Sequence, residues 1–537
     1  MVYSIAQHII TPIADTIEGN LQSLLNKRTV FAQHTSVRGM VLKKGVLASL
    51  FENIPVIEGY TVFESLCIQA IAQAVSEKNI DITSSRCVFI LSSTKGDIWV
   101  SMAQTAKHIA GYFGNYTSPI VVSTACTSGV SAQLTAWRLL QAGMYDTAVV
   151  VGCDVQCEFI ISGFQSFEAL STFPCKPFDK NRDGLNPGEA VAVMVMSTTK
   201  PENGRVWCML GGSIHNDANH ISGPSRTGEG SLRCLEDMLH LLSLQSLACL
   251  SLHGTGTLYN DEMESIAVHR SGLQNVPVSA LKGYYGHTMG AAGLLETILT
   301  MRAIECGVIL PVNGYEQQGT TYAMNISTEV RHTDKTSFIK LLSGFGGVNA
   351  AVAWSLEENE VAVHTAKWNT IAELTLNAGE NIDGLYRNKI NDYPKYFKMD
   401  KLCRLGFVTT ELLKQKLQSE MPDFSIDSEK CCVILASRMA SVNNDTEYRQ
   451  TIADKDNYYP SPSLFVYTLP NILAGEIAIR NHMYGETACY VLAGEDEMEK
   501  IVNASLWSSQ YTQALVGWVD YPEDENFVSH IKILTKE

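Results

Sequence analysis

One cysteine lies where the chain passes from an apolar run into a helix-like pattern. The segment "VVSTACTSGV" contains Cys126, followed by small hydroxylated residues and a glycine. A thiol has an ordinary pKa of about 8.5, and a helix N-terminus beside it lowers that value and supplies thiolate. Small neighbours such as Ala125 and Gly129 would admit a substrate and leave backbone N–H groups free to face an oxyanion. A lone cysteine in an apolar turn is more often a packing residue, so the remaining chemistry must decide.

Three further segments contain residues that could act with such a nucleophile. His253 precedes a Gly/Thr loop in "SLHGTGTLYNDEMES", and Lys282 and His287 lie five residues apart in "SALKGYYGHTMGAAGLLE". Phe345 lies among glycines in "LLSGFGGVNAAVAW". Neutral imidazoles can donate hydrogen bonds to a developing oxyanion, and an acyl group on a cysteine is an electrophile. Together these types suit acyl transfer through a covalent intermediate.

The elements that must position these residues follow from the apolar pattern. Continuous β-branched and apolar runs indicate strands covered on both faces. Four such runs precede the histidines, at residues 86–93, 120–126, 146–154 and 190–197. After residue 127, apolar residues recur at helical spacing, and Gly143 is placed to end that helix. Cys126 is therefore predicted at a strand-to-helix turn.

The C-terminal part of the chain repeats the pattern of its beginning. Three segments echo earlier ones: 430–437 resembles 86–93, 477–496 resembles 109–128, and 514–520 resembles 148–154. In this overlay Gly494 takes the place of Cys126, so the copy has no nucleophile. The polar stretch 357–370 is placed to hold the boundary. The copy is expected to end near 514–520, and its long segment 444–480 is expected to lie on a dimer-facing side.

Length and composition limit the classes of protein that fit. A chain of 537 residues with 45% apolar residues and mean hydropathy near zero predicts a globular protein of two or more domains. A net charge of −16 argues against nucleic acid or an anionic membrane as the main partner. The 14 cysteines show no zinc-like spacing, and no stretch reads as a signal peptide or membrane span, so a cytoplasmic protein without a metal is expected.

In their order and spacing, these segments resemble the beta-ketoacyl-acyl-carrier-protein synthases, condensing enzymes of the thiolase superfamily. The resemblance includes "CKPFDKNRDGLNPGEAVAVMVM", which is similar to that family's (R/K)PFD…RDG…GE segment. It implies a thiolase-like α/β fold in α-β-α-β-α layers with duplicated halves over residues 1–355. A linker at 356–364 and a truncated, ketosynthase-like second domain at 365–537 would follow.

The resemblance also implies roles for individual residues. Cys126 matches the acyl-accepting nucleophile, and His253 and His287 match the two histidines of the elongating branch. Lys282 matches the lysine that supports the second histidine. Phe345 matches the gating phenylalanine, whose backbone N–H would form the oxyanion hole with that of Cys126. Asp261 and Glu264, after the glycine loop, are expected to be structural.

What the resemblance implies for function is decarboxylative Claisen condensation of a cysteine-bound acyl group with a malonyl thioester, in fatty acid, polyketide or polyene biosynthesis. The substrates would be carried on the phosphopantetheine of an acyl carrier protein, and no other cofactor is expected. A homodimer is the default expectation, because in that family the strand near the Cys126 turn pairs across a two-fold axis. A heterodimer with another ketosynthase-like chain is an alternative.

Three other functions compete with this one. A partner subunit of the chain-length-factor kind typically lacks the nucleophile that Cys126 supplies, although that description fits the second domain. A Cys–His hydrolase would leave Lys282, His287 and Phe345 unexplained. A malonyl-carrier decarboxylase that does not condense uses the same residues, and only its products would distinguish it. For the second domain, a structural, dimer-forming or carrier-docking role is expected.

Overall fold

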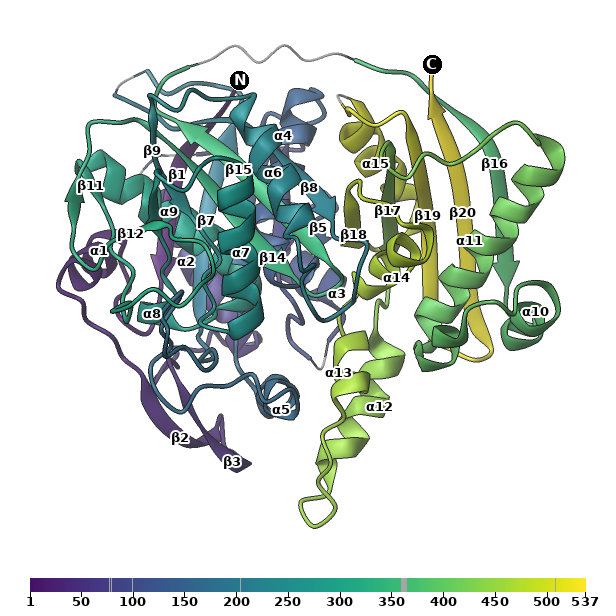
Figure 1. Cartoon of the computed structure of the whole chain (residues 1–537), viewed down its shortest axis with the longest axis horizontal. Helices are drawn as coiled ribbons and strands as arrows, with labels where there is room; N and C mark the ends of the chain where they lie inside the picture. The colour runs from purple at the N-terminus through teal and green to yellow at the C-terminus, as the bar shows by residue number, and fades with distance from the viewer. Residues whose placement is uncertain (77, 79, 99, 203, 359–364, 508) are drawn as a thin grey trace.

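The computed structural model describes the whole chain except residues 77, 79, 99, 203, 359–364 and 508. Most of the predicted linker, 359–364, therefore lies outside the described residues. Two bodies lie side by side, a larger one formed by residues up to Ser355 and a smaller one from Trp368 onward (Figure 1). A single hydrogen-bonded sheet of 16 described strands runs through both.

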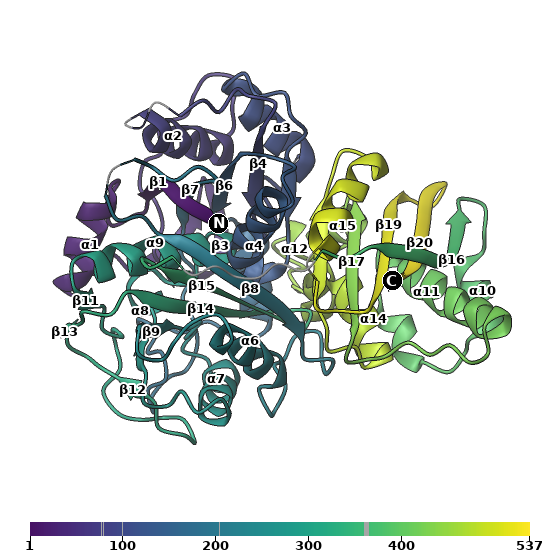
Figure 2. The same ribbon diagram turned by 90° about the horizontal axis from the view of Figure 1, so that it is seen from above.

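The first half of the larger body contains the predicted early strands. In spatial order they are β1 (Val2–Ile10), β7 (Ala190–Ser197), β6 (Thr147–Asp154), β4 (Cys87–Ser92) and β5 (Ile120–Val122). Every residue of β4, β5 and β7 is buried, as the continuous apolar runs predict. Helices α2 (Val62–Ser76) and α3 (Met102–Tyr112) cover the outer face (Figure 2). The hairpin of β2 (Ala32–Val37) and β3 (Met40–Ala48) and helix α1 (Ile17–Leu25) lie outside this sheet.

The second half of the larger body carries the histidine and phenylalanine segments. Its strands are, in order, β8 (Cys208–Asn216), β15 (Val348–Ser355), β14 (Ser337–Gly344), β9 (Leu247–Ser251), β10 (Pro277–Ser279) and β12 (Asn325–Ile326). Helices α6 (Glu229–Leu239) and α7 (Leu258–Arg270) cover its outer face. A short antiparallel contact of β1 with β8 joins the two halves. Strands β11 (Val308–Ile309) and β13 (Arg331–His332) pair separately.

Two helices form the layer between the half-sheets. They are α4 (Ser128–Gln141), which ends just before Gly143 as predicted, and α9 (Ala292–Glu305) (Figure 2). Their N-terminal ends meet at Gly129 and Gly293, where a Cβ on Gly293 would lie 2.8 Å from the Gly129 Cα. Glycine at both positions lets the two backbones touch, and this brings the Cys126 turn against the His287 segment.

The smaller body repeats the strand order of the first half. From its inner edge outward it consists of β18 (Thr487–Val491), β17 (Cys431–Ser437), β19 (Gln513–Glu523), β20 (Asn526–Lys536) and β16 (Trp368–Asn377). Read outward from β5, the larger body has the equivalent sequence β5, β4, β6, β7, β1. The expectation that the copy ends near 514–520 was wrong, because β20 and β16 complete a five-stranded half.

A carboxylate at the end of the third strand repeats as well. Asp154, the last residue of β6, accepts hydrogen bonds from the Ser93 hydroxyl (2.6 Å) and the Thr94 N–H (3.0 Å). Asp520 in β19 accepts from the Ser437 hydroxyl (2.9 Å) and the Arg438 N–H (3.1 Å). In both bodies a buried carboxylate therefore holds the turn that follows the neighbouring strand.

The two bodies differ in the connection that follows this turn. In the larger body, β4 leads to β5 through α3 alone. In the smaller body, the connection contains α12 (Val442–Ala453), α13 (Pro462–Tyr467) and α14 (Ile472–Asn481). The outer helices of the smaller body are α10 (Ile382–Lys389) and α11 (Lys401–Glu420), and α15 (Met498–Trp507) packs against α4. The longer connection is directed at the larger body, where α12 and α13 contact α5 (Glu158–Ser166).

The inner edges of the two bodies pair with each other. Val122 and Val121 of β5 lie opposite Tyr490 and Val491 of β18 in an antiparallel ladder. The strand near the Cys126 turn thus has a partner, but within the same chain. The reasoning for a homodimer through this edge does not apply, because β18 already occupies it.

Candidate active site

Cys126 lies at the turn that the sequence predicts. Strand β5 ends at Val122, and a 3₁₀ turn, η1 (Ala125–Thr127), leads into α4. Ala125 has φ of +52°, a left-handed conformation that is costly for alanine and turns the chain sharply. Because of this turn the Cys126 side chain faces a cavity at the N-terminal end of α4.

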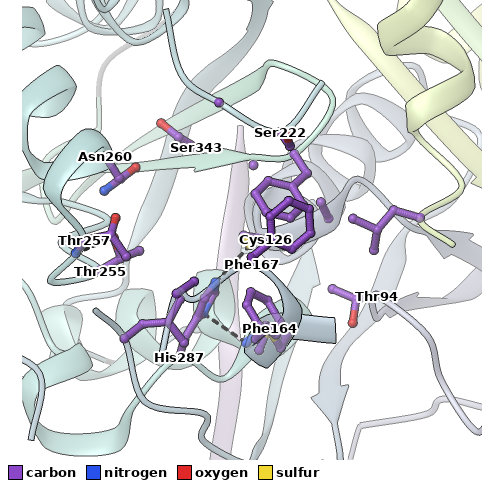
Figure 3. A pocket seen from close by; sticks show the side chains of 18 of the residues that line it. Thr94, Cys126, Phe164, Phe167, Ser222, Thr255, Thr257, Asn260, His287 and Ser343 are labelled. Carbon is purple, nitrogen blue, oxygen red and sulfur yellow. Dashed lines mark hydrogen bonds between the residues drawn. The ribbon is translucent and has the colours of Figure 1, made fainter. Parts of the chain in front are cut away.

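The two predicted histidines meet at the cysteine. The Nε2 atom of His287 lies 2.9 Å from the Cys126 Sγ, and the His253 and His287 ring centroids are 5.2 Å apart. A dashed line marks the contact between His287 and Cys126 in Figure 3. The Met289 N–H donates to Nδ1 of His287 at 3.2 Å. This bond assigns the neutral His287 tautomer with its proton on Nε2, so the ring donates toward the sulfur. His253 has a buried Nδ1 without a hydrogen-bond partner among the described residues.

A buried cluster of charges lies behind the histidines. The Lys282 ammonium donates to the His253 backbone oxygen at 2.7 Å and to the Glu296 carboxylate at 2.8 Å. Lys340 binds the other oxygen of Glu296 and donates to the Leu252 carbonyl at 3.1 Å. Two ammonium groups therefore share one carboxylate in the core and hold the backbone at His253. Lys282, which the resemblance matches to the lysine that supports His287, makes these hydrogen bonds to Glu296 and the His253 segment, and its charge also lowers the pKa of His287.

The acidic residues after the glycine loop hold that loop in place. Glu264 accepts from the backbone N–H groups of His253 (2.7 Å) and Gly254 (2.8 Å). Asp261 accepts from the Thr255 and Phe178 N–H groups, at 3.0 and 2.6 Å. These contacts agree with the structural role expected for both carboxylates.

Phe345 lies on the loop between β14 and β15, as predicted. The adjoining Gly344 is so close to the cysteine that a Cβ there would lie 3.3 Å from the Cys126 nitrogen. The Phe345 ring packs against Phe167 and Phe164, with centroids 5.6 and 6.5 Å away. The loop therefore lies against the Cys126 turn, and Phe345 lines the same cavity as the cysteine.

The cavity beside Cys126 has a volume of about 340 Å³ and a mostly apolar wall. Helix α5 and its end contribute apolar side chains, among them Ile160, Phe164 and Phe167. Thr255, Thr257 and Asn260 line another side with hydroxyl and amide groups, and Ser222 lies apart from them, beside the aromatic rings (Figure 3). The smaller body also contributes to the wall, through Phe465, Thr468 and Leu469. The shape suits a long apolar group attached to a polar arm.

Burial controls the protonation of these groups. Burial, with help from the Lys282 ammonium, holds the pKa values of His253 and His287 well below their usual range, so both rings are neutral. Burial also raises the pKa of the Cys126 thiol to about 12, an effect that Lys282 opposes. The resting cysteine is therefore a thiol. The thiolate expected from the helix N-terminus must form against this burial, helped by the His287 Nε2–H.

The sulfur and the two imidazoles also form a set of metal-ligand atoms. One atom from each of Cys126, His253 and His287 lies within 4.8 Å of the others. Thiolate and imidazole are ligands that zinc accepts. The Met289 N–H occupies Nδ1 of His287 and leaves the proton on Nε2, so this ring would have to lose that proton before it could bind a metal.

The sequence reasoning missed the partners of these residues. Glu296 and Lys340 lie within apolar segments, where a charge is a signal because it must be paired when buried. Phe465, Thr468 and Leu469 belong to the 444–480 segment, which was expected to face a dimer interface. No local pattern marks them as lining the site of another domain.

Two family models match the chain. They are described as beta-ketoacyl synthase N-terminal domain, over residues 70–201, and beta-ketoacyl synthase C-terminal domain, over residues 208–316. A putative polyketide beta-ketoacyl synthase 1 of Streptomyces halstedii is 30% identical over 264 residues, which cover 46% of this chain and 63% of that protein. The 3-oxoacyl-[acyl-carrier-protein] synthase 2 of Mycobacterium leprae is 30% identical over 247 residues, covering 43% and 59%. The chain spans about three fifths of the length of these curated relatives.

Solved structures of related proteins extend the likeness in fold. A "PfaC Keto synthase-Chain length factor" structure matches with a TM-score of 0.75 at 14% identity, covering 99% of this chain and 78% of that chain. A ketosynthase, ApeO, in complex with its chain length factor, ApeC, from Xenorhabdus doucetiae has a TM-score of 0.58 at 22% identity, covering 66% and 98%. These neighbours confirm the predicted thiolase-like α/β fold. Among the described residues, no helix combines the length and apolar character needed to cross a lipid bilayer.

Proposed function

We propose that the chain acts as a beta-ketoacyl synthase, the family whose two models match residues 70–201 and 208–316, and that it joins an acyl group on Cys126 to a malonyl thioester by decarboxylative condensation. Both substrates would be delivered on the phosphopantetheine arm of an acyl carrier protein. The observation that carries the proposal is the meeting of one thiol and two neutral imidazoles, with Cys126 Sγ and His287 Nε2 2.9 Å apart, beside an apolar cavity.

The first half-reaction loads the acyl group. As the thiol proton leaves, the Cys126 sulfur attacks the acyl thioester carbon, the carbon–sulfur bond to the carrier breaks, and the carrier thiol takes up a proton. The backbone N–H groups of Cys126 and Phe345 are the proposed donors to the tetrahedral oxyanion. The His287 Nε2–H favours the thiolate against the burial that raises its pKa.

The second half-reaction forms the carbon–carbon bond. Loss of carbon dioxide from the malonyl thioester leaves an enolate whose charge resides on the thioester oxygen. His253 and His287, both neutral, donate to that oxygen, so the site stabilises the charge only as it develops. The enolate carbon attacks the acyl carbon and the Cys126–acyl bond breaks. The released Cys126 thiolate takes up a proton from solvent, and the ketoacyl product leaves on the carrier. Lys282 fixes the backbone of His253 throughout.

The smaller body, which corresponds to the predicted second domain, lacks this set of one cysteine and two histidines. Gly494 follows β18 at the position where Cys126 follows β5, and the domain consists of one five-stranded half. We assign it no catalytic step. It is the part of the chain to which a chain-length-factor-like description best applies, because it pairs with β5 and lines the cavity.

The test is mass spectrometry of the protein after incubation with a series of acyl-carrier thioesters. An acyl adduct on Cys126 that is absent from Cys126→Ala would support the nucleophile. Ketoacyl-carrier product after addition of malonyl-carrier would support condensation. Carbon dioxide release without a ketoacyl product would favour the decarboxylase alternative. No adduct with any thioester would contradict the proposal.

A further inference from the structure

The second domain packs against both segments that surround the nucleophile. Its hydrophobic cluster includes Ala125, the residue before Cys126, which is buried, and Phe345 and Phe167 pack against the same cluster. Its α13–α14 segment contributes Phe465 and Leu469 to the cavity wall. The second domain is therefore in contact with the site and not only with the outer edge of the sheet.

The peptide group that follows Phe345 is held at both of its polar atoms. Asn471, the N-cap residue of α14, donates from Nδ2 to the Phe345 carbonyl at 2.7 Å. The N–H of the same peptide group, on Gly346, donates to the Ile221 carbonyl at 2.6 Å. A peptide plane fixed at both ends leaves the Phe345 loop little freedom.

Two glycines make this contact sterically possible. Gly346 has φ of +90°, and a Cβ there would lie 2.5 Å from the Asn471 Nδ2. One turn into α14, a Cβ on Gly475 would lie 2.7 Å from the Gly346 carbonyl oxygen. The backbone of helix α14 and the backbone of the loop are therefore in direct contact. A methyl group added to the helix at this point would displace the loop.

The orientation of the Asn471 amide follows from its surroundings. A carbonyl oxygen accepts only, so the amide group that faces it must be the NH₂. Asn471 Oδ1 is buried and has no hydrogen-bond partner among the described residues. Among the described residues, the hydrogen bond from Nδ2 to the Phe345 carbonyl is thus the one that holds this side chain.

We propose that Asn471 is a positioning residue: from the second domain, it holds the Phe345 loop in the closed position over Cys126. The inference rests on the proposed function, in which Cys126 accepts the acyl group, and on the gating role that the resemblance implies for Phe345. It gives the second domain a defined part in the reaction cycle, since the loop cannot open to admit a substrate without straining or breaking a hydrogen bond to that domain.

The test compares two isosteric variants in the full chain. Asn471→Asp keeps the shape of the side chain but sets a carboxylate against the Phe345 carbonyl. Asn481→Asp is the matched control, because Asn481 lies at the other end of α14 and donates Nδ2 to Ile477 O within the helix at 2.9 Å. For each variant the rate of Cys126 alkylation by iodoacetamide is measured by peptide mass spectrometry, together with kcat and KM for condensation.

With Asn471→Asp we expect the alkylation of Cys126 to accelerate at least about threefold and kcat to fall about tenfold, with KM for the carrier within about twofold. Asn481→Asp should match the wild type in all three. A purely structural role for Asn471 would predict that the two variants differ only in thermal stability. That result would overturn the proposal.

Gly475→Ala provides a second route if Asn471→Asp folds poorly. Alanine favours the helix more than glycine does, so the helix itself is not weakened, but the added methyl group pushes against the Gly346 carbonyl. The same faster alkylation of Cys126 is expected, and unchanged alkylation in both variants would count against the inference. Alkylation needs no acyl substrate, so this comparison tests the role of the loop independently of the proposed function. If the wild-type protein accepts no acyl group, the proposed function is overturned, but the alkylation rates still decide whether Asn471 positions the loop.

Discussion

Val122 of β5 and Tyr490 of β18 face each other across an antiparallel strand pair. The two residues are equivalent: Val122 has the same place in the larger body that Tyr490 has in the smaller one. The overlay that sets Gly494 at the place of Cys126 also sets Tyr490, four residues earlier, at the place of Val122. Equivalent residues meet in this way only on a two-fold axis. The sheet therefore has an approximate dyad between β5 and β18, and the two bodies on either side of it belong to one chain.

A buried ion pair beside this dyad should contribute strongly to stability. Arg138 of α4 makes two hydrogen bonds to Glu486, of 2.7 and 2.6 Å, and the Glu486 side chain is 3% exposed. Glu486→Gln leaves the arginine charge buried without its partner, so we expect a loss of about 3–5 kcal/mol in the free energy of unfolding. Calorimetry or denaturant titration measures this loss.

The exposed pair of Arg86 with Asp146 provides the control. It has similar distances, but its side chains are 47% and 57% exposed. Asp146→Asn should lower the free energy of unfolding far less than Glu486→Gln does, because solvent screens the pair. Equal losses in the two variants would show that the contact between the two bodies contributes no more than a surface pair.

The reactivity of Cys126 should rise with pH without levelling off. Burial raises the pKa of its thiol to about 12, so the thiolate fraction increases about tenfold for each pH unit across the neutral and mildly alkaline range. Alkylation rates from pH 6 to 9, measured on the Cys126 peptide, should follow that slope. Cys306, which is exposed, serves as a reference for reagent access. A plateau near pH 7 would show that the helix N-terminus and His287 outweigh burial.

Condensation should tolerate mild acid. The neutral forms of His253 and His287 are the proposed donors, and burial holds the pKa of both rings well below 6.5. Both rings therefore stay neutral as the pH falls through 6.5, and the acid limb of kcat lies below that value. Lys340→Met removes one of the ammonium groups that lower both pKa values and should move the limb upward. An acid limb at or above pH 6.5 in the wild type would contradict this assignment.

The same shifts predict how stability depends on pH. An unfolded chain protonates these histidines as the pH falls through 6.5, whereas the folded chain does not. The contribution of these two histidines to the free energy of unfolding is therefore at its full value above pH 6.5. It decreases as the pH falls from 6.5 toward their pKa values in the folded state. The free energy of unfolding, measured between pH 8 and 5, should fall less in His253→Gln than in the wild type.

The residues that carry short local signals were predicted correctly in position. Cys126 lies at a strand-to-helix turn, His253 precedes its glycine loop, and Phe345 lies between two buried strands. Each of these predictions depends on a pattern of fewer than twenty residues. The prediction that the residues meet in one cavity depended on the resemblance to a known family, since no periodicity relates positions so far apart in sequence.

Long-range contacts could not be predicted in this way. Glu296 and Lys340 become partners only when α9 packs beneath β14, and the sequence places them 44 residues apart. An unpaired edge at β5 indicates that another strand must cover it, but does not say whether that strand comes from a second copy or from β18. The expectation of a low thiol pKa considered the helix end alone, whereas the pKa is raised by the burial that the packed core imposes.

The difference in connection length between the two bodies has a consequence for how the protein can be assembled and altered. The long α12–α14 segment packs on the body that has the cysteine. The short β4–β5 connection contributes Lys95, whose ammonium binds Asp445 and the Thr468 carbonyl of that segment. Both halves are translated as one polypeptide, so their ratio is fixed at one to one, and dilution does not separate them because the covalent link keeps their effective concentration high. A damaging mutation in the smaller body therefore stays joined to the body that contains Cys126. An intact smaller body cannot replace it by exchange.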